Sequence, residues 1–156
     1  MWRTNGAGEL YTYLPPDFTQ NQVVCDIPPF STCNDVYGAS IGRGSFSWKT
    51  GGRTTIAQRL RLNDAGQSNG ELELFVGGKS VINVGGLVIS NSSEGRIRGM
   101  QFQTFFGGMS FRFCNEHMIM TPKFHLHSLG SDSSWASPTD QYVWFSDFSM
   151  AITELL

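Results

Sequence analysis

The sequence predicts an all-β fold, a two-sheet antiparallel sandwich of the jelly-roll type. Three observations lead to this prediction: short runs in which apolar and polar residues alternate, glycine-containing turns between those runs, and no segment with convincing helical periodicity. About eight short strands are expected. With 156 residues, of which 40% are hydrophobic and 15% charged, the chain has the size and composition of one domain with a buried core.

Composition and charge exclude several classes of function. The net charge of −2 leaves no basic stripe that could bind nucleic acid. No apolar run approaches the ~20 residues that a membrane helix needs. The polar residues 1–6 are unlike a secretion signal. The protein is therefore either cytosolic, or the first residue given is not that of the complete protein.

Residues 8–15, GELYTYLP, form the first strand candidate, which follows a turn and ends at two prolines. In an extended strand Glu9, Tyr11 and Tyr13 point to one face, and the mostly apolar residues between them point to the other. Two phenols on an open face can stack on sugars and exchange protons with them. Alternation alone favours the plainer interpretation, an aromatic pair that only steadies a sheet.

Residues 17–35 are expected to form a loop held by cysteines. Cys25 and Cys33 bracket a proline-containing stretch that a disulfide could clamp, which would favour an oxidising compartment. The alternative is two unpaired buried thiols. Because the chain has three cysteines, the disulfide would leave Cys114 without a partner.

Two strands are expected next, over residues 37–48 and 53–62. The first is rich in glycine, and strict alternation places Ile41 and Arg43 on the same face. The second alternates apolar residues with arginines, which we expect on a solvated face.

The strongest local pattern is a β-hairpin over residues 71–84, with Gly77 and Gly78 as a two-residue turn. Glu71 and Glu73 share its outer face. Nothing in the surrounding sequence would separate their pKa values, as an acid–base pair requires, so we expect two solvated charges.

Three further strands are expected over residues 87–89, 96–106 and 142–152. Within the second of these, Gln101 and Gln103 share a face.

Residues 109–130 interrupt this organisation as an anomalous insertion within the single domain 1–156. They hold all three histidines and show neither alternation nor helical periodicity. A metal site is one interpretation, but no zinc spacing is met, and no dense carboxylate loop suits calcium. We expect no metal and no cofactor. A surface loop is the favoured interpretation, and a translated short intron is the third.

Several segments together carry a family resemblance: MWRTNGAGELYTYLP, CNDVYGASIGRGSFSW, NGELELFVGGKSVINV, GRIRGMQFQTFFGG and SSWASPTDQYVWFSDFSMAI. They cover nearly all of residues 1–108 and 131–153, and the combination of GELYxYLP, SIGRGSF and QTFFGG is specific. In these segments the chain resembles the fungal members of polysaccharide lyase family 14, which are β-jelly-roll enzymes related to alginate and glucuronan lyases.

The resemblance implies a secreted enzyme that cleaves polyuronates of the alginate or glucuronan type by β-elimination. A base removes the proton on C5 of the uronate, and the glycosidic oxygen leaves from C4. Cationic or hydrogen-bonding groups must stabilise the charge that develops on the carboxylate, and a proton acceptor and donor must lie within hydrogen-bond reach. The family's Y-x-Y pair falls on Tyr11 and Tyr13. A tyrosine can act in this way where positive charge lowers its pKa from ~10.

The chain also departs from the family. The family's lysine and Ser-x-Arg motif lie upstream of the segment that matches residues 1–3, so we expect an N-terminally incomplete fold with exposed strand edges. The chain as given is expected to be inactive. Strand parity makes Arg3, Arg43, Gln101 and Gln103 candidate substrate-binding residues. The expected partner is an acidic polysaccharide, and the expected state is a monomer.

The competing interpretation is a non-catalytic carbohydrate-binding β-sandwich. In that case Tyr11, Tyr13, Trp48 and Phe105 would serve only as stacking platforms.

Overall fold

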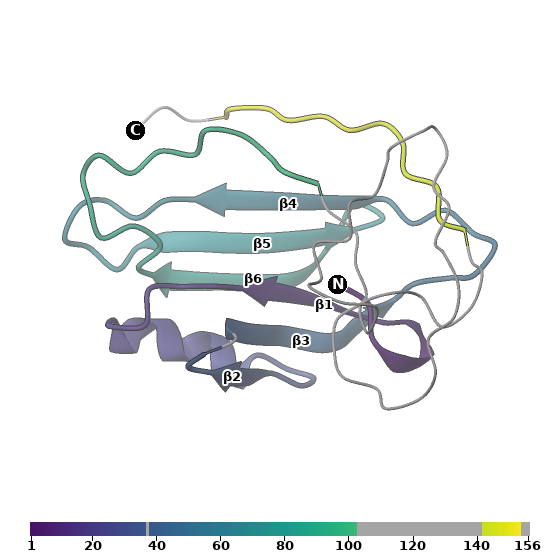
Figure 1. The fold of residues 1–156 in the computed structure, drawn as a ribbon, viewed down its shortest axis with the longest axis horizontal. Helices are drawn as coiled ribbons and strands as arrows, with labels where there is room; N and C mark the ends of the chain where they lie inside the picture. Colours follow the sequence, from purple (N-terminus) through teal and green to yellow (C-terminus); the bar gives the residue numbers. More distant parts are fainter. Residues whose placement is uncertain (37, 103–141, 154–156) are drawn as a thin grey trace, which may run out of the picture. The chain divides into compact units, whose positions relative to one another are not determined.

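The computed structural model describes residues 1–36, 38–102 and 142–153 (Figure 1). The chain divides into two compact units, Met1–Ile97 and Arg98–Leu156. Every strand found among the described residues belongs to the first unit.

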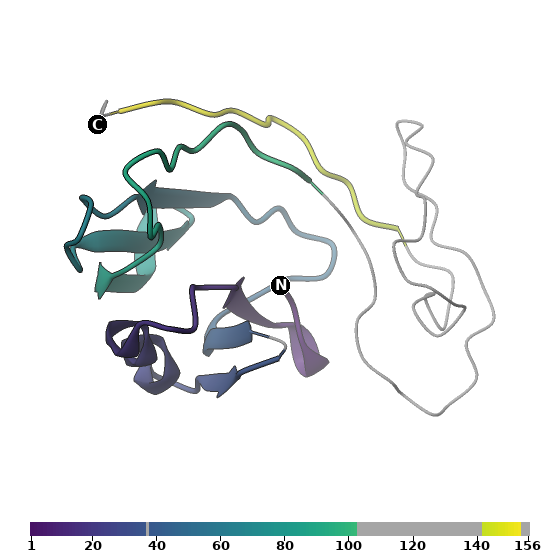
Figure 2. The same cartoon turned by 60° about the vertical axis from the view of Figure 1, so that its left-hand side comes forward.

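Two three-stranded antiparallel sheets make up the first unit. One sheet has the order β1-β3-β2, formed by β1 (Ala7–Thr12), β3 (Gly38–Ser47) and β2 (Thr32–Asn34). The other has the order β4-β5-β6, formed by β4 (Ile56–Arg61), β5 (Gly70–Val76) and β6 (Lys79–Leu87). Figure 2 shows them as two layers. The predicted all-β, two-sheet architecture is confirmed.

The core of the first unit takes side chains from both sheets. Ile41 of β3 and Ile82 and Leu87 of β6 are almost fully buried. Alternation along β3 and β6 explains the burial of Ile41 and Ile82, because every second residue of a strand faces the same side. Leu87 lies an odd number of residues from Ile82 and reaches the core through the register shift between β5 and β6 at Gly70 and Leu72. The remaining buried members of the cluster are Leu10, Val24, Ala39, Leu72, Leu74 and Val84.

The predicted hairpin is confirmed as β5 and β6. Gly77 and Gly78 join the strands with φ angles of +57° and +78°, a backbone region that favours glycine. The expectation for Glu73 was wrong, since its exposed fraction is only 7%. Arg59 lies directly opposite on β4 and covers it, with Nη2 3.1 Å from the Glu73 carboxylate and 3.0 Å from that of Glu71.

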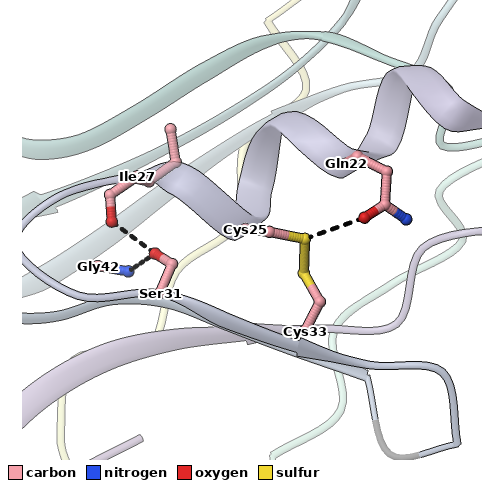
Figure 3. Close-up of a disulfide and its surroundings, with 6 residues drawn as sticks. All are labelled: Gln22, Cys25, Ile27, Ser31, Cys33 and Gly42. Atoms are coloured by element: carbon pink, nitrogen blue, oxygen red, sulfur yellow. Dashed lines mark hydrogen bonds between the residues drawn. A yellow bond between two sulfur atoms is a disulfide. The ribbon is translucent and has the colours of Figure 1, made fainter.

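Residues 17–35 contain more regular structure than the predicted loop. A 3₁₀ helix, η2 (Thr19–Asp26), leads through a short connection into β2. The predicted disulfide is present and joins Cys25 of η2 to Cys33 of β2 (Figure 3). Between them, the Ser31 hydroxyl donates to the carbonyl of Ile27 at 2.6 Å and accepts from the amide of Gly42 at 2.8 Å.

Two buried asparagines hold the segment that follows β6. The side chain of Asn21 accepts from the amide of Val88 and donates to its carbonyl, both at 2.9 Å. The Asn63 carbonyl oxygen accepts from the amides of Ile89 and Ser90 at 2.8 Å each. The strand predicted over residues 87–89 therefore does not continue past Leu87, since side chains rather than a neighbouring strand satisfy this backbone.

Residues 96–102 and 142–152 form no strand, so the strands predicted over 96–106 and 142–152 are wrong for these stretches. Phe102 packs edge-on against Phe145 and Phe148 at ring-centroid distances of 4.6 and 5.0 Å. A strand is stable only where its backbone groups are paired, and no ladder forms along these stretches. Residues 103–106 and the whole insertion 109–130 lie outside the described residues. Among the described residues, no helix is long and apolar enough to cross a membrane.

Replacing Cys25 and Cys33 by serine should lower the free energy of unfolding by about 2.5 kcal/mol. The disulfide joins cysteines that are 8 positions apart, and this is the chain-entropy estimate for a loop of that length. Denaturant unfolding of protein purified under oxidising conditions measures the loss. Cys114→Ser is the matched control, because it removes a thiol and leaves the disulfide intact. Wild-type stability in the double variant would contradict the structural role of the bridge.

Candidate functional site

The outer face of the first sheet carries the two tyrosines. Leu10 of β1 is buried in the core, while Tyr11 and Tyr13 lie on the opposite side with their rings in edge-to-face contact, 5.6 Å apart between centroids. Tyr11 is partly buried, and Tyr13 is 76% exposed. The shared face predicted for this pair is confirmed by the contact.

Glu9, on the same face, is a buried carboxylate with an exposed fraction of 1%. Arg3 donates from Nε to its Oε1 at 2.6 Å, and Arg43 donates from Nε to its Oε2 at 2.7 Å. The hydroxyl of Ser40 donates to the same Oε2 at 2.5 Å and accepts from Nη2 of Arg43 at 3.1 Å. These four residues, named the Glu9 cluster below, bring together side chains from three separate stretches of the chain.

A tight turn brings Arg3 to this cluster. The short 3₁₀ helix η1 (Thr4–Gly6) reverses the chain, with Asn5 at φ +60° and Gly6 at φ +74°. The amide of Arg3 then donates to the carbonyl of Ala7 at 2.7 Å. Residues 1–3 therefore fold back beside the start of β1, and the Arg3 guanidinium lies next to Glu9 and over the ring of Tyr11, 5.8 Å from its centroid.

Irregularities in both strands bring Arg43 to the cluster. Strict alternation predicted Arg43 on the same face as Ile41, and this was wrong. Gly42 has φ +60° and interrupts the alternation, and β1 has a register shift between Gly8 and Leu10. Ile41 consequently enters the core, whereas the guanidinium of Arg43 reaches Glu9 on the outer face.

The pKa values of Glu9 and Tyr11 are shifted in opposite directions. Burial opposes ionisation of Glu9, but hydrogen bonds from Arg3, Ser40 and Arg43 outweigh it, so the pKa of Glu9 is lowered. Burial raises the pKa of Tyr11, and the neighbouring Tyr13 adds to that effect while Arg3 opposes it. The arginines therefore stabilise a carboxylate more than they favour an ionised Tyr11.

Four of the six predicted catalytic and substrate-binding residues come together here: Tyr11, Tyr13, Arg3 and Arg43. Gln101 is exposed in the second unit, and Gln103 lies outside the described residues. Sequence reasoning missed the role of Glu9 as the common partner of both arginines. The available signal was Glu9 itself, a single glutamate in a strand whose other face is apolar. A carboxylate in such a strand is buried only when it is paired, so a cationic partner could have been expected.

This arrangement presents phenol hydroxyls and guanidinium N–H donors on one sheet face. Such donors suit an anionic, hydroxyl-rich ligand, since guanidinium groups bind carboxylates in a fixed geometry. Among the described residues, no group of three histidine, cysteine, aspartate or glutamate side chains could hold a metal ion.

The family model of polysaccharide lyase 14 matches residues 1–122. Among solved structures, the chain is similar to the marine PL-14 alginate lyase from Aplysia kurodai, with 28% sequence identity and a TM-score of 0.58. The match covers 88% of this chain and 44% of the alginate lyase, so the chain spans less than half of that protein's length. No curated protein matches the chain. The jelly-roll fold and the family resemblance predicted from the sequence are confirmed.

Glu9→Gln should lower the free energy of unfolding by about 1.5–3 kcal/mol at pH 7, since hydrogen bonds to a charged group are replaced by weaker ones. Because the pKa of Glu9 is lowered in the folded state, its stabilising effect is present above its unfolded pKa of about 4.3 and is lost as the pH falls through the folded value. The stability difference between wild type and variant should therefore shrink in acid. Denaturant unfolding between neutral and acidic pH measures it.

Glu94→Gln is the control, because it removes an exposed carboxylate outside the cluster. A wild-type advantage over Glu9→Gln that stays constant down to strongly acidic pH would contradict the lowered pKa.

Proposed function

The chain belongs to polysaccharide lyase family 14, and from this premise we propose that the protein is a polyuronate lyase that cleaves alginate- or glucuronan-type polymers by β-elimination. The observation that carries the proposal is the placement of two phenols and two guanidinium groups on one face of the first sheet. These are the group types that proton transfer and uronate binding require.

In this proposal Tyr11 and Tyr13 exchange protons with the sugar. One phenol, as phenolate, takes the C5 proton, and a phenol hydroxyl gives a proton to the departing glycosidic oxygen at C4. The elimination leaves a C4–C5 double bond in the new non-reducing sugar. Their rings are in contact, so both hydroxyls can serve one bound sugar unit without a large movement of the backbone.

Arg3 and Arg43 bind the uronate carboxylate. Their side chains remain 30% and 34% exposed although both are bonded to Glu9. A guanidinium has five N–H donors, so donors remain for a ligand beyond those that Glu9 and Ser40 occupy. Glu9 holds the two arginines in place and offsets part of their positive charge.

The raised pKa of Tyr11 means that a base at this position needs more positive charge than Arg3 supplies. The family resemblance attributes that charge to a lysine and to the arginine of a Ser-x-Arg motif. We accordingly propose that these 156 residues alone are inactive or nearly so, and that the active form carries those groups as well. The Cys25–Cys33 disulfide fits a secreted enzyme that acts on an extracellular acidic polysaccharide.

A second candidate is a carbohydrate-binding protein without catalysis. The exposed ring of Tyr13 favours it, because an accessible phenol can stack on a sugar without any proton transfer. The two candidates differ in whether the Tyr11 hydroxyl matters.

Tyr11→Phe, made in a form of the protein that also carries the family's lysine and Ser-x-Arg motif, should slow the release of unsaturated uronate by roughly 10²–10⁴-fold, the usual effect of losing an acid/base group. Polymer affinity should change little, because phenylalanine keeps the ring. Turnover and binding are measured in parallel on the same polyuronate.

Tyr142→Phe is the matched control, since it removes a phenol hydroxyl from an exposed tyrosine of the second unit. Equal turnover in Tyr11→Phe and wild type would remove Tyr11 from the chemistry, and binding without turnover in every form would favour the second candidate.

A further inference from the structure

The loop after the second sheet contains the sequence Asn91-Ser92-Ser93. We propose that Asn91 is a site of N-linked glycosylation. Asparagine, any residue except proline, and serine or threonine together form the acceptor pattern for this modification. Of all the asparagines in the chain, Asn91 alone stands in such a pattern. The inference rests on the secreted location included in the proposed function, and it is independent of lyase activity.

The structure leaves the acceptor accessible. Asn91, Ser92 and Ser93 are all exposed and lie in a bend and turn outside any strand. The loop is shaped by its other groups: the Ser90 hydroxyl donates to the carbonyl of Ser92 at 2.9 Å, and the Ser92 hydroxyl accepts from the amide of Glu94 at 3.1 Å. A glycan on Asn91 would therefore replace no hydrogen bond that the loop needs.

The base of this loop is fixed to the fold. Asn63 is buried and accepts from the amides of Ile89 and Ser90, immediately before the acceptor. Its amide nitrogen also donates to the carbonyl of Ser90 at 3.0 Å. Asn63 is thus a structural asparagine, whereas Asn91 projects from the point where the fixed backbone ends. The side-chain amide of Asn63 is therefore needed by the fold, whereas that of Asn91 is open to modification.

Asn91 is one of the residues that line a pocket, which offers room for the first sugar. Its volume is about 200 Å³, and its walls include Phe18, Gln20 and Gln67. An aromatic ring and side-chain amides are groups that contact a sugar ring by stacking and by hydrogen bonds. We expect a glycan to rest against this surface, with its further sugars directed to solvent.

The modification is a group transfer from a lipid-linked oligosaccharyl pyrophosphate. The bond between C1 of the first sugar and the phosphate oxygen breaks, and the lipid pyrophosphate leaves with the electron pair. A bond forms between that C1 and Nδ2 of Asn91, which loses one proton. The Ser93 hydroxyl is the second element that the transfer requires. The oxidising compartment indicated by the Cys25–Cys33 disulfide is also where secreted proteins receive such glycans.

The test is to express the full 156-residue chain behind a secretion signal in a eukaryotic host, and to treat total cellular and secreted protein with peptide-N-glycosidase F. We expect wild type to shift to faster gel mobility after treatment. Asn91→Gln and Ser93→Ala should migrate at that faster position without treatment. Ser93→Thr keeps the pattern and should keep the glycan, and Ser92→Ala, at the unrestricted middle position, is the matched control that should also keep it.

Mass spectrometry of the treated wild type should locate the new carboxylate at position 91. Because the added signal ensures entry into the secretory pathway, the result does not depend on where the natural protein resides or on whether it is a lyase. Because total cellular protein is included, a variant that fails to fold still reports its glycan. Wild type without a glycan, in cells that glycosylate a control protein, would overturn the proposal.

Discussion

The interaction on which the candidate site depends is the buried carboxylate of Glu9, held between two arginines. A charge removed from water is stable only when it is paired and its oxygens are hydrogen-bonded. Arg3, Arg43 and Ser40 meet that requirement for both oxygens. The Glu9 carboxylate therefore links three parts of the chain: the turn before β1, the part of β3 around Gly42, and the part of β1 just before Tyr11.

The same strands connect this face to the core. Leu10 and Ile41 are register partners on β1 and β3, and both are buried on the side opposite to the tyrosines. Packing against the second sheet thus positions the backbone that carries Tyr11 and Ser40, which are also register partners. The site is built on the pair of strands β1 and β3. Apolar contacts hold one face of this pair and the Glu9 cluster holds the other, which limits how far the functional groups can move.

Periodicity and turn chemistry could predict much of the fold and part of the site. The alternation of β5 and the pair Gly77-Gly78 predicted the hairpin, because these residues satisfy backbone requirements locally. The face of Arg43 could not be predicted in this way, since the positive φ of Gly42 becomes visible only in the folded chain. The burial of Glu9 likewise depends on partners that are 6 and 34 positions away in the sequence. The strands expected around Phe102 and Trp144 failed because alternation describes one strand and supplies no partner for it.

The measurement that tests the proposed function most directly is the ultraviolet detection of unsaturated uronate. The purified protein, in the form that also carries the family's lysine and Ser-x-Arg motif, is incubated separately with alginate, glucuronan and a neutral glucan. We expect absorbance to rise with time on at least one of the two polyuronates and to stay flat on the neutral polymer. Binding to a polyuronate with no absorbance change would contradict the lyase proposal. It would favour a non-catalytic carbohydrate-binding role for the sheet face that carries Tyr11 and Tyr13.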